Sequence, residues 1–166
     1  RVDAAAELLR SMDHQVDVLP APQAVEDFNR AAWPVLSSTG LAAVLAPLAG
    51  REALLTPALA QLLQAGRRHT AVDLFEAQAR QRALRLAMDQ VFATHDLVLT
   101  PACAAMPWPA TETHPALIDG QPVDGRGHAV FTAFVNGAGL PALALPLAPH
   151  GGLPVGLQLV GPPGSD

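Results

Sequence analysis

Residues 131–163 read FTAFVNGAGLPALALPLAPHGGLPVGLQLVGPP. An apolar helical pattern comes first and stops at a Gly-Leu-Pro break, residues 139–141. Two apolar segments follow, 141–147 and 154–160, and both alternate at period two, as strands with two different faces do. A second Gly-Leu-Pro, residues 152–154, ends the short loop between them, which predicts a hairpin. This order of helix, break and hairpin decides the fold that we expect.

The residues before this stretch are mainly helical in pattern. Apolar spacing predicts helices at residues 3–13, 25–46, 51–65 and 70–93. Pro34 is expected to bend the second helix, and Gly66 to end the third. Thr70 and Asp73 form an acidic variant of the capping box at the start of the fourth. Strands are predicted at residues 16–20 and 97–99, the latter buried on both faces.

The composition is that of a globular chain with a buried core. Of its 166 residues, 50% are hydrophobic and 15% charged. Between residues 101 and 127, prolines and Asp-Gly turns exclude long helices and predict a loop region. Helices followed by a few apolar strands indicate an α/β chain with an incomplete sheet. The helical pattern already present at Arg1, and a helix-cap pair at Ser165-Asp166, suggest a single partial domain, residues 1–166, of a longer protein.

Charge and hydropathy exclude two classes of partner. The formal net charge is −5 and no basic stripe exists, so nucleic acid is not expected to bind. No uninterrupted apolar run approaches the roughly 18 residues of a membrane span, so no membrane partner is expected. The single cysteine, Cys103, cannot form an internal disulfide, which fits a cytoplasmic location.

Four ordered motifs suggest a family. They are the strand exit from Asp96 to Pro101, Phe131-Thr132 with Asn136, Gly139 to Ala142, and Gly152 to Gly161. Together they resemble the C-terminal part of the amidase signature family. The resemblance implies an α/β/α sandwich around a mixed sheet. It also implies hydrolysis of a small-molecule amide through a Ser–cis-Ser–Lys triad, with a Gly-rich loop binding the oxyanion and no cofactor.

The triad has no counterpart in these residues. All ten basic residues are arginine, so no lysine can act as the base, and the family's Gly-Gly-Ser-Ser-Gly-Gly loop is absent. Ser37 and Ser38 lie in a helical run and are interpreted as helix hydroxyls. We therefore assign no catalytic residue and expect residues 1–166 alone to be inactive. The alternative is a non-catalytic α/β module with a binding or structural role.

The resemblance still suggests a substrate-binding wall. It places Thr132 and Val135 near the acyl side of the substrate, although core packing would explain both equally well. Ala129 stands where the tRNA-dependent amidotransferases of the family carry an acidic residue, which favours a general amidase. Structural roles are expected for the residues around the two breaks, namely Asn136, which would cap backbone groups, and Gly139, Pro141, Gly152 and Pro154.

The sequence spacing gives little support to other kinds of site, namely a metal site or another catalytic triad. His114, Asp119, Asp124 and His128 could be drawn as a metal site, but they match no standard ligand pattern, and no metal is expected. No Gly-x-Ser-x-Gly elbow supports a Ser-His-Asp triad. Cys103 is interpreted as a small buried hydrophobe, and His95 as a partner of a helix C-terminus.

The predicted strands also bear on association. If their neighbours in the sheet are missing, the three segments 97–99, 141–147 and 154–160 would present unpaired edges. Such edges favour pairing with another chain. We therefore expect self-association or poor solubility of residues 1–166.

Overall fold

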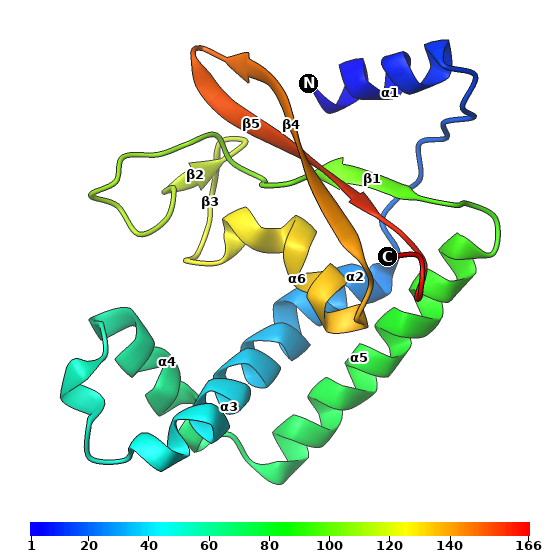
Figure 1. The fold of residues 1–166 in the computed structure, drawn as a ribbon. Coiled ribbons are helices and arrows are strands. Elements are labelled where there is room, and N and C mark those ends of the chain that lie inside the picture. The colour runs from blue at the N-terminus through cyan, green and yellow to red at the C-terminus, as the bar shows by residue number, and fades with distance from the viewer. The chain divides into compact units, whose positions relative to one another are not determined.

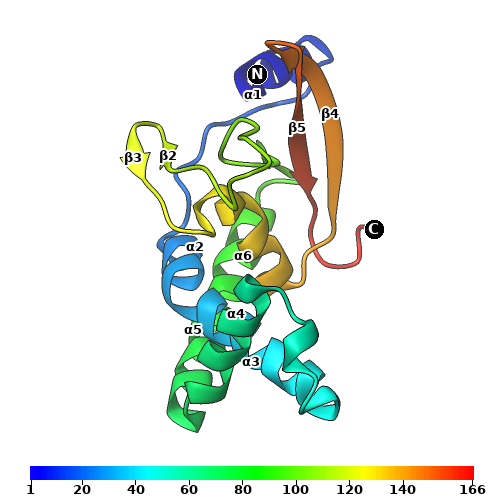
Figure 2. The same ribbon diagram turned by 90° about the vertical axis from the view of Figure 1, so that its left-hand side faces the viewer.

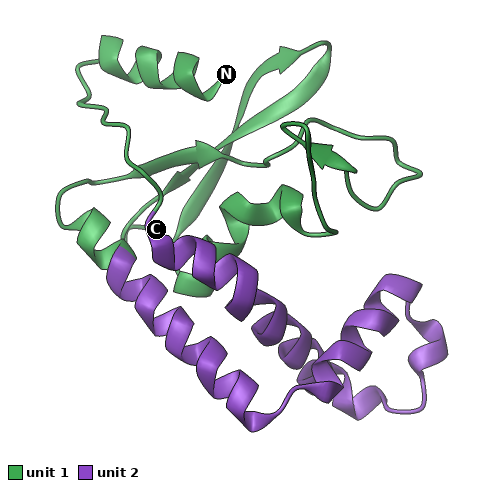
Figure 3. Cartoon of the chain, turned by 180° about the vertical axis from the view of Figure 1, so that it is seen from behind, with its two compact units in different colours: residues 1–21, 88–166 green, residues 22–87 purple.

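A computed structural model describes residues 1–166, and the chain divides into two compact units (Figure 3). The sheet unit comprises residues 1–21 and 88–166, and the helical unit comprises residues 22–87. The boundary falls within one long helix, α5 (Ala71–Phe92). Each unit is described separately.

The sheet unit is built on three antiparallel strands, β1 (Val98–Pro101), β4 (Ala142–His150) and β5 (Leu153–Val160) (Figure 1). The order is β1-β5-β4, so β5 is central. The predicted hairpin is confirmed, with Leu143 opposite Leu159. Burial of the first strand on both faces is wrong: β1 is an edge strand with every residue half-buried, and Leu97 just before it is exposed.

Helix α6 (Val130–Ala138) belongs to the sheet unit and follows a short 3-10 turn, Gly127–Ala129 (Figure 2). The helix expected before the Gly-Leu-Pro break is confirmed. The helix and the central strand supply most of the buried side chains of this unit, which are Ala133, Phe134, Val135, Ala138, Leu157 and Val160. Burial of these apolar groups is the main stabilising term for the unit.

The N-terminal helix, α1 (Val2–Ser11), has no buried residue. The strand predicted at residues 16–20 is wrong, because residues 14–22 form no strand. Pro20 and Pro22 lack the N–H that a strand ladder needs. The segment is instead held by single contacts: the Arg10 guanidinium donates to the Val16 carbonyl at 2.8 Å.

The loop region 101–127 contains a two-stranded hairpin, β2 (Leu117–Ile118) and β3 (Gln121–Pro122). Asp119 and Gly120 form its turn with φ angles of 50° and 73°. Aspartate and glycine tolerate this left-handed region best, which is why the Asp-Gly dipeptide indicated a turn.

The helical unit starts with one continuous helical segment. It comprises α2 (Gln23–Asp27), a π-helical turn (Phe28–Ala32), α3 (Trp33–Leu45) and a final 3-10 turn (Ala46–Leu48). Pro34 has no N–H to continue the α-helical ladder, and the turn before it is π-helical, with the Trp33 N–H bonded to the Phe28 carbonyl. The predicted irregularity at Pro34 is therefore a change of hydrogen-bond register.

Helix α4 (Pro57–Arg68) follows a 3-10 turn, Glu52–Leu54. The Thr56 hydroxyl accepts the Leu59 N–H at its N-terminus. The prediction that Gly66 ends this helix is wrong, because Gly66 lies within it and is buried. It is needed for packing: a Cβ there would overlap the backbone carbonyl of Ser38 on α3. A helix C-cap and a close helix crossing both select glycine, so the sequence did not separate them.

The capping box before α5 is confirmed. The Asp73 carboxylate accepts the Thr70 N–H at 2.8 Å, and the Thr70 hydroxyl accepts the Asp73 N–H at 3.1 Å. These bonds satisfy two groups that the end of a helix otherwise leaves unpaired. Leu84 and Met88, one turn apart on this helix, are both buried.

The segment Gln23–Leu48 is long and apolar enough to cross a membrane, by length and composition only. Its mean hydropathy is 1.4, and 11% of the window is buried. It is not an uninterrupted apolar run, because Glu26, Asp27 and Arg30 lie within it. Core helices of soluble proteins meet the same two criteria, so the segment is weak support for a membrane span.

Candidate functional site

The proposed substrate wall is the first two turns of α6. Thr132 is half-buried, and its hydroxyl donates to the Ala129 carbonyl at 3.1 Å. Val135, one turn further, is 3% exposed and lies in the core. The two candidates therefore differ: Thr132 retains surface that a ligand could contact, whereas Val135 is surrounded by protein. Ala129 is half-buried at the N-terminal end of the helix.

The Gly-Leu-Pro break after α6 is a left-handed helix cap. Gly139 has φ 74°, and the N–H groups of Gly139 and Leu140 both bond to the Val135 carbonyl. Asn136 contributes its carbonyl to the Gly139 N–H, while its side chain is exposed. The Pro141 carbonyl then accepts the Gly161 N–H at 3.0 Å, which aligns the start of β4 with the end of β5.

The turn of the main hairpin is made by Gly151 and Gly152, with φ angles of 59° and 79°. The register between β4 and β5 shifts there, between Leu147 and His150. Pro154 lies opposite the irregular part of β4, where a strand tolerates the loss of an N–H. The two prolines and two glycines of this motif therefore have backbone roles.

Gln158 is the polar residue that the sequence did not single out. It occupies a polar position of the alternating pattern in β5, yet it is only 6% exposed. Its amide nitrogen donates to the Phe131 carbonyl of α6 at 2.7 Å and to the Thr100 hydroxyl of β1 at 3.0 Å. The signal was present, since an amide in the middle of a strand between apolar residues needs partners if both faces of that strand are covered.

The serines of α3 are helix hydroxyls, as predicted. Ser38 is 1% exposed, and its Oγ donates to the Pro34 carbonyl at 2.6 Å. The Nε2 atom of His69 lies 3.1 Å from the same oxygen. A buried hydroxyl that bonds to its own helix is a packing group, because it has no open side for a substrate. Ser37 also contacts the Pro34 carbonyl, at 3.4 Å.

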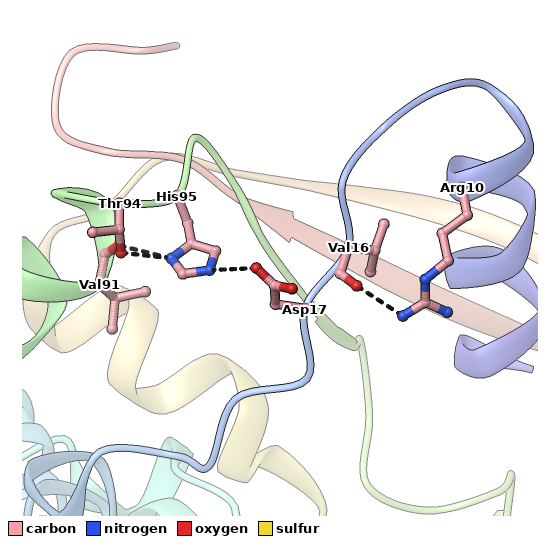
Figure 4. Close-up of polar contacts among 6 residues, drawn as sticks. All are labelled: Arg10, Val16, Asp17, Val91, Thr94 and His95. Atoms are coloured by element: carbon pink, nitrogen blue, oxygen red, sulfur yellow. Dashed lines mark hydrogen bonds and ion pairs between the residues drawn. The ribbon is translucent and has the colours of Figure 1, made fainter.

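The predictions for Cys103 and His95 differ in outcome, one being wrong and the other confirmed. The prediction that Cys103 is buried is wrong: it is exposed, and its thiol donates to the His128 carbonyl at 3.4 Å. His95 interacts with a helix end as predicted, since its Nδ1 lies 3.3 Å from the Val91 carbonyl near the C-terminus of α5. Its Nε2 faces Asp17 at 3.5 Å (Figure 4).

Three of the four loop residues drawn as a metal site have other contacts, and Asp119 lies in the β2–β3 turn. The Asp124 carboxylate accepts the Arg126 N–H at 2.9 Å, and His114 Nδ1 lies 3.0 Å from the Thr113 hydroxyl. The ring of His128 packs against Trp108 at 5.0 Å between centroids. No group of three or more His, Cys, Asp or Glu side chains is placed to hold a metal ion.

Two carboxylates have perturbed acidity, and both lie in the helical unit. Hydrogen bonds from Thr70 lower the pKa of Asp73, and the Arg67 guanidinium lowers the pKa of Glu52. Both carboxylates are solvent-exposed groups at helix ends or turns, so these shifts reflect local hydrogen bonding and not a catalytic cleft.

Comparison with known families identifies the class. The Amidase family profile matches residues 2–166. The chain therefore belongs to the amidase signature family, and its mixed α/β fold is that of the family.

Curated relatives match about half of the chain. Two of them are the A subunits of glutamyl-tRNA(Gln) amidotransferases. The chain from Nitratiruptor sp. is 38% identical over 88 residues, which is 52% of this chain and 18% of the relative. Its counterpart in Xanthobacter autotrophicus is 44% identical over 89 residues, 52% of this chain and 17% of the relative. The matches thus span less than a fifth of these relatives.

Solved structures match nearly the whole chain. A crystal structure of an amidase has a TM-score of 0.87 at 26% identity, covering 99% of this chain and 37% of that one. A bacterial aryl acylamidase of the amidase signature family has a TM-score of 0.82 at 21% identity, covering 97% and 36%. The second likeness shows the fold alone.

Proposed function

We propose that this chain forms the C-terminal part of an amidase, which hydrolyses a carboxylic amide to a carboxylate and ammonia or an amine. The observation that carries the proposal is the family match over residues 2–166. The amidase signature resemblance implies a Ser–cis-Ser–Lys triad. Since all ten basic residues here are arginine, the triad belongs to another part of the enzyme.

In this proposal the chain contributes a wall of the substrate pocket. Thr132 supports that role, because it is half-buried on the first turns of α6 and its hydroxyl bonds locally to Ala129. The near-complete burial of Val135 supports packing behind the wall. Thr132→Val in the whole enzyme should change the KM for amides and leave the melting temperature nearly unchanged. Unchanged KM values would remove Thr132 from the wall.

The proposed substrate is a small amide and not glutamine. Ala129 is apolar, so it cannot pair with the ammonium of an amino acid as a carboxylate could. The second candidate is the glutamine-dependent component of a tRNA amidotransferase, which the names of the curated relatives favour.

A substrate panel separates the two candidates. The whole enzyme would be given aliphatic and aryl amides in one set and glutamine with aminoacyl-tRNA in the other, and ammonia, carboxylate and amidated tRNA would be measured. Hydrolysis of simple amides is expected. Transfer of ammonia from glutamine to aminoacyl-tRNA would overturn the general amidase.

Residues 1–166 alone should be inactive toward amides, because they hold no lysine base. The decisive comparison is between this chain and its Ser37→Ala and Ser38→Ala variants. If the chain hydrolysed amides and either variant abolished the rate, the catalytic site would be in this chain after all. If neither this chain nor the whole protein hydrolysed amides, the non-catalytic module would be favoured.

Self-association through sheet edges is also proposed. Strands β1 and β4 are the outer strands of the sheet, and Leu143 on β4 is 57% exposed. Light scattering on residues 1–166 should show a mass above that of one chain, and Leu143→Lys should reduce it. A monodisperse monomer with a cooperative melt would contradict this. A cytoplasmic location stays a prediction.

A further inference from the structure

We propose that Gln158 is a positioning residue, whose side-chain amide holds α6 on the sheet and thereby sets the acyl selectivity of the enzyme. The inference rests on the proposed function for its substrate, and on the sheet unit alone for its geometry. Gln158 lies in the central strand β5, and its two hydrogen bonds go to Phe131 and Thr100, to which the family resemblance gives no part in the reaction.

The amide uses its two donor hydrogens on two different elements. One bond, at 2.7 Å, goes to the Phe131 carbonyl in the first turn of α6. The other, at 3.0 Å, goes to the Thr100 hydroxyl of β1. The Thr100 hydroxyl in turn donates to the Pro101 carbonyl at 3.1 Å, so it is free to act only as an acceptor toward Gln158. The direction of the bonds is therefore determined.

This arrangement defines where α6 lies along the sheet. A buried apolar contact is non-directional, so apolar burial alone does not fix the orientation of the first turn of α6 as a hydrogen bond does. A hydrogen bond requires a distance near 2.9 Å and an aligned N–H. With only 6% of Gln158 exposed, water cannot replace a lost partner cheaply.

The bonded carbonyl is adjacent to the proposed wall. Phe131 directly precedes Thr132, and both lie in the first turn of the helix. A shift of this turn moves the Thr132 side chain with it. Loss of the Gln158 bonds should therefore alter which acyl groups fit the pocket, beyond any loss of stability.

The test uses four substitutions in the whole enzyme. Gln158→Met keeps the length of the side chain but removes both donors, and Leu157→Ala destabilises the same strand without touching α6 through a hydrogen bond. Thr100→Val removes the acceptor on β1, and Thr100→Ser restores it. The readouts are KM and kcat for amides with small and bulky acyl groups.

Gln158→Met should change the ratio of kcat/KM between bulky and small acyl groups by about fivefold, the factor that one hydrogen bond typically represents. Leu157→Ala should lower the melting temperature and leave that ratio within twofold. Thr100→Val should give an intermediate change that Thr100→Ser reverses. An unchanged ratio in Gln158→Met, with a melting temperature like that of Leu157→Ala, would overturn the proposal.

A second measurement keeps the two proposals apart. Hydrogen exchange of residues 131–140 is followed in residues 1–166, where no activity is needed. Faster hydrogen exchange of this segment in Gln158→Met, and not in Leu157→Ala, supports the positioning role. This holds even if no amide is hydrolysed and the proposed function fails. Equal exchange in both variants overturns the positioning role, whatever the enzyme's activity.

Discussion

The helical unit and the sheet unit are stabilised by different kinds of contact. In the helical unit, α3 and α4 approach so closely that only glycine fits at residue 66. In the sheet unit, a buried amide at residue 158 links its own strand to α6 and β1. In the helical unit, the missing side chain of Gly66 allows two helices to pack closely. In the sheet unit, the hydrogen bonds of the Gln158 side chain fix how its neighbours are oriented.

The largest effect is expected at Gly66. Gly66→Ala places a Cβ on the Ser38 carbonyl, a backbone group that cannot turn aside. Separation of α3 from α4 should cost about 3 kcal/mol, the upper range for overpacking. Urea unfolding followed by circular dichroism measures the change.

The matched control is Gly40→Ala, since Gly40 lies inside α3 and has open space around it. That substitution should be neutral or stabilise by up to about 1 kcal/mol, because alanine favours helix. Equal effects at the two glycines would show that helix propensity, and not the close crossing, determines the response.

A smaller loss is expected at Ser38, which lies at the same crossing. Ser38→Ala removes the hydroxyl shared by the Pro34 carbonyl and His69, and leaves a half-buried imidazole without that partner. The expected destabilisation is about 1–2 kcal/mol. Ser37→Ala, the neighbouring control, should stay within about 0.5 kcal/mol. A larger loss at Ser37 would contradict the assignment of the buried hydroxyl.

The capping box of α5 should respond to both mutation and pH. Thr70→Ala should destabilise by about 1 kcal/mol. Hydrogen bonds from Thr70 lower the pKa of Asp73 below its usual 3.8. A lowered carboxylate pKa stabilises the folded state above pH 3.8, and that contribution is lost as the pH falls through the folded pKa.

The measurement is helicity and unfolding free energy from pH 6 to pH 2. Wild type should lose somewhat more stability than Thr70→Ala below about pH 4. The variant keeps the backbone N–H of residue 70 but lacks the hydroxyl that also donates to the ionised Asp73. Parallel curves for the two proteins would show that the Thr70 hydroxyl does not contribute to stabilising the ionised Asp73.

The smallest effect is expected in the sheet unit, at the contact between Asp17 and His95. The atoms are 3.5 Å apart and Asp17 is half exposed, so Asp17→Asn should cost at most about 0.5 kcal/mol. A double-mutant cycle with His95→Gln isolates the pair. A coupling above about 1 kcal/mol would make residues 14–21 a stabilising part of the unit.

Local signals in the sequence predicted most of the elements. The Gly-Leu-Pro breaks, the period-two strands and the Thr70–Asp73 box all encode their structure within a few residues, and each is found. Two of the errors came from local patterns that are compatible with more than one structure. Gly66 reads as a helix end but serves a helix crossing, and the alternation at residues 16–20 finds no strand partner.

The sequence by itself determined the family, the order of α6 and its hairpin, and the absence of lysine, because these depend on residue identity and short spacing. Only the tertiary structure decided that Gln158 is buried, that Val135 lies in the core while Thr132 keeps some surface, and that Gly66 meets Ser38. Burial and close approach depend on which distant segments meet. Residues 66 and 38, or 158 and 131, carry no local pattern that reveals their partner.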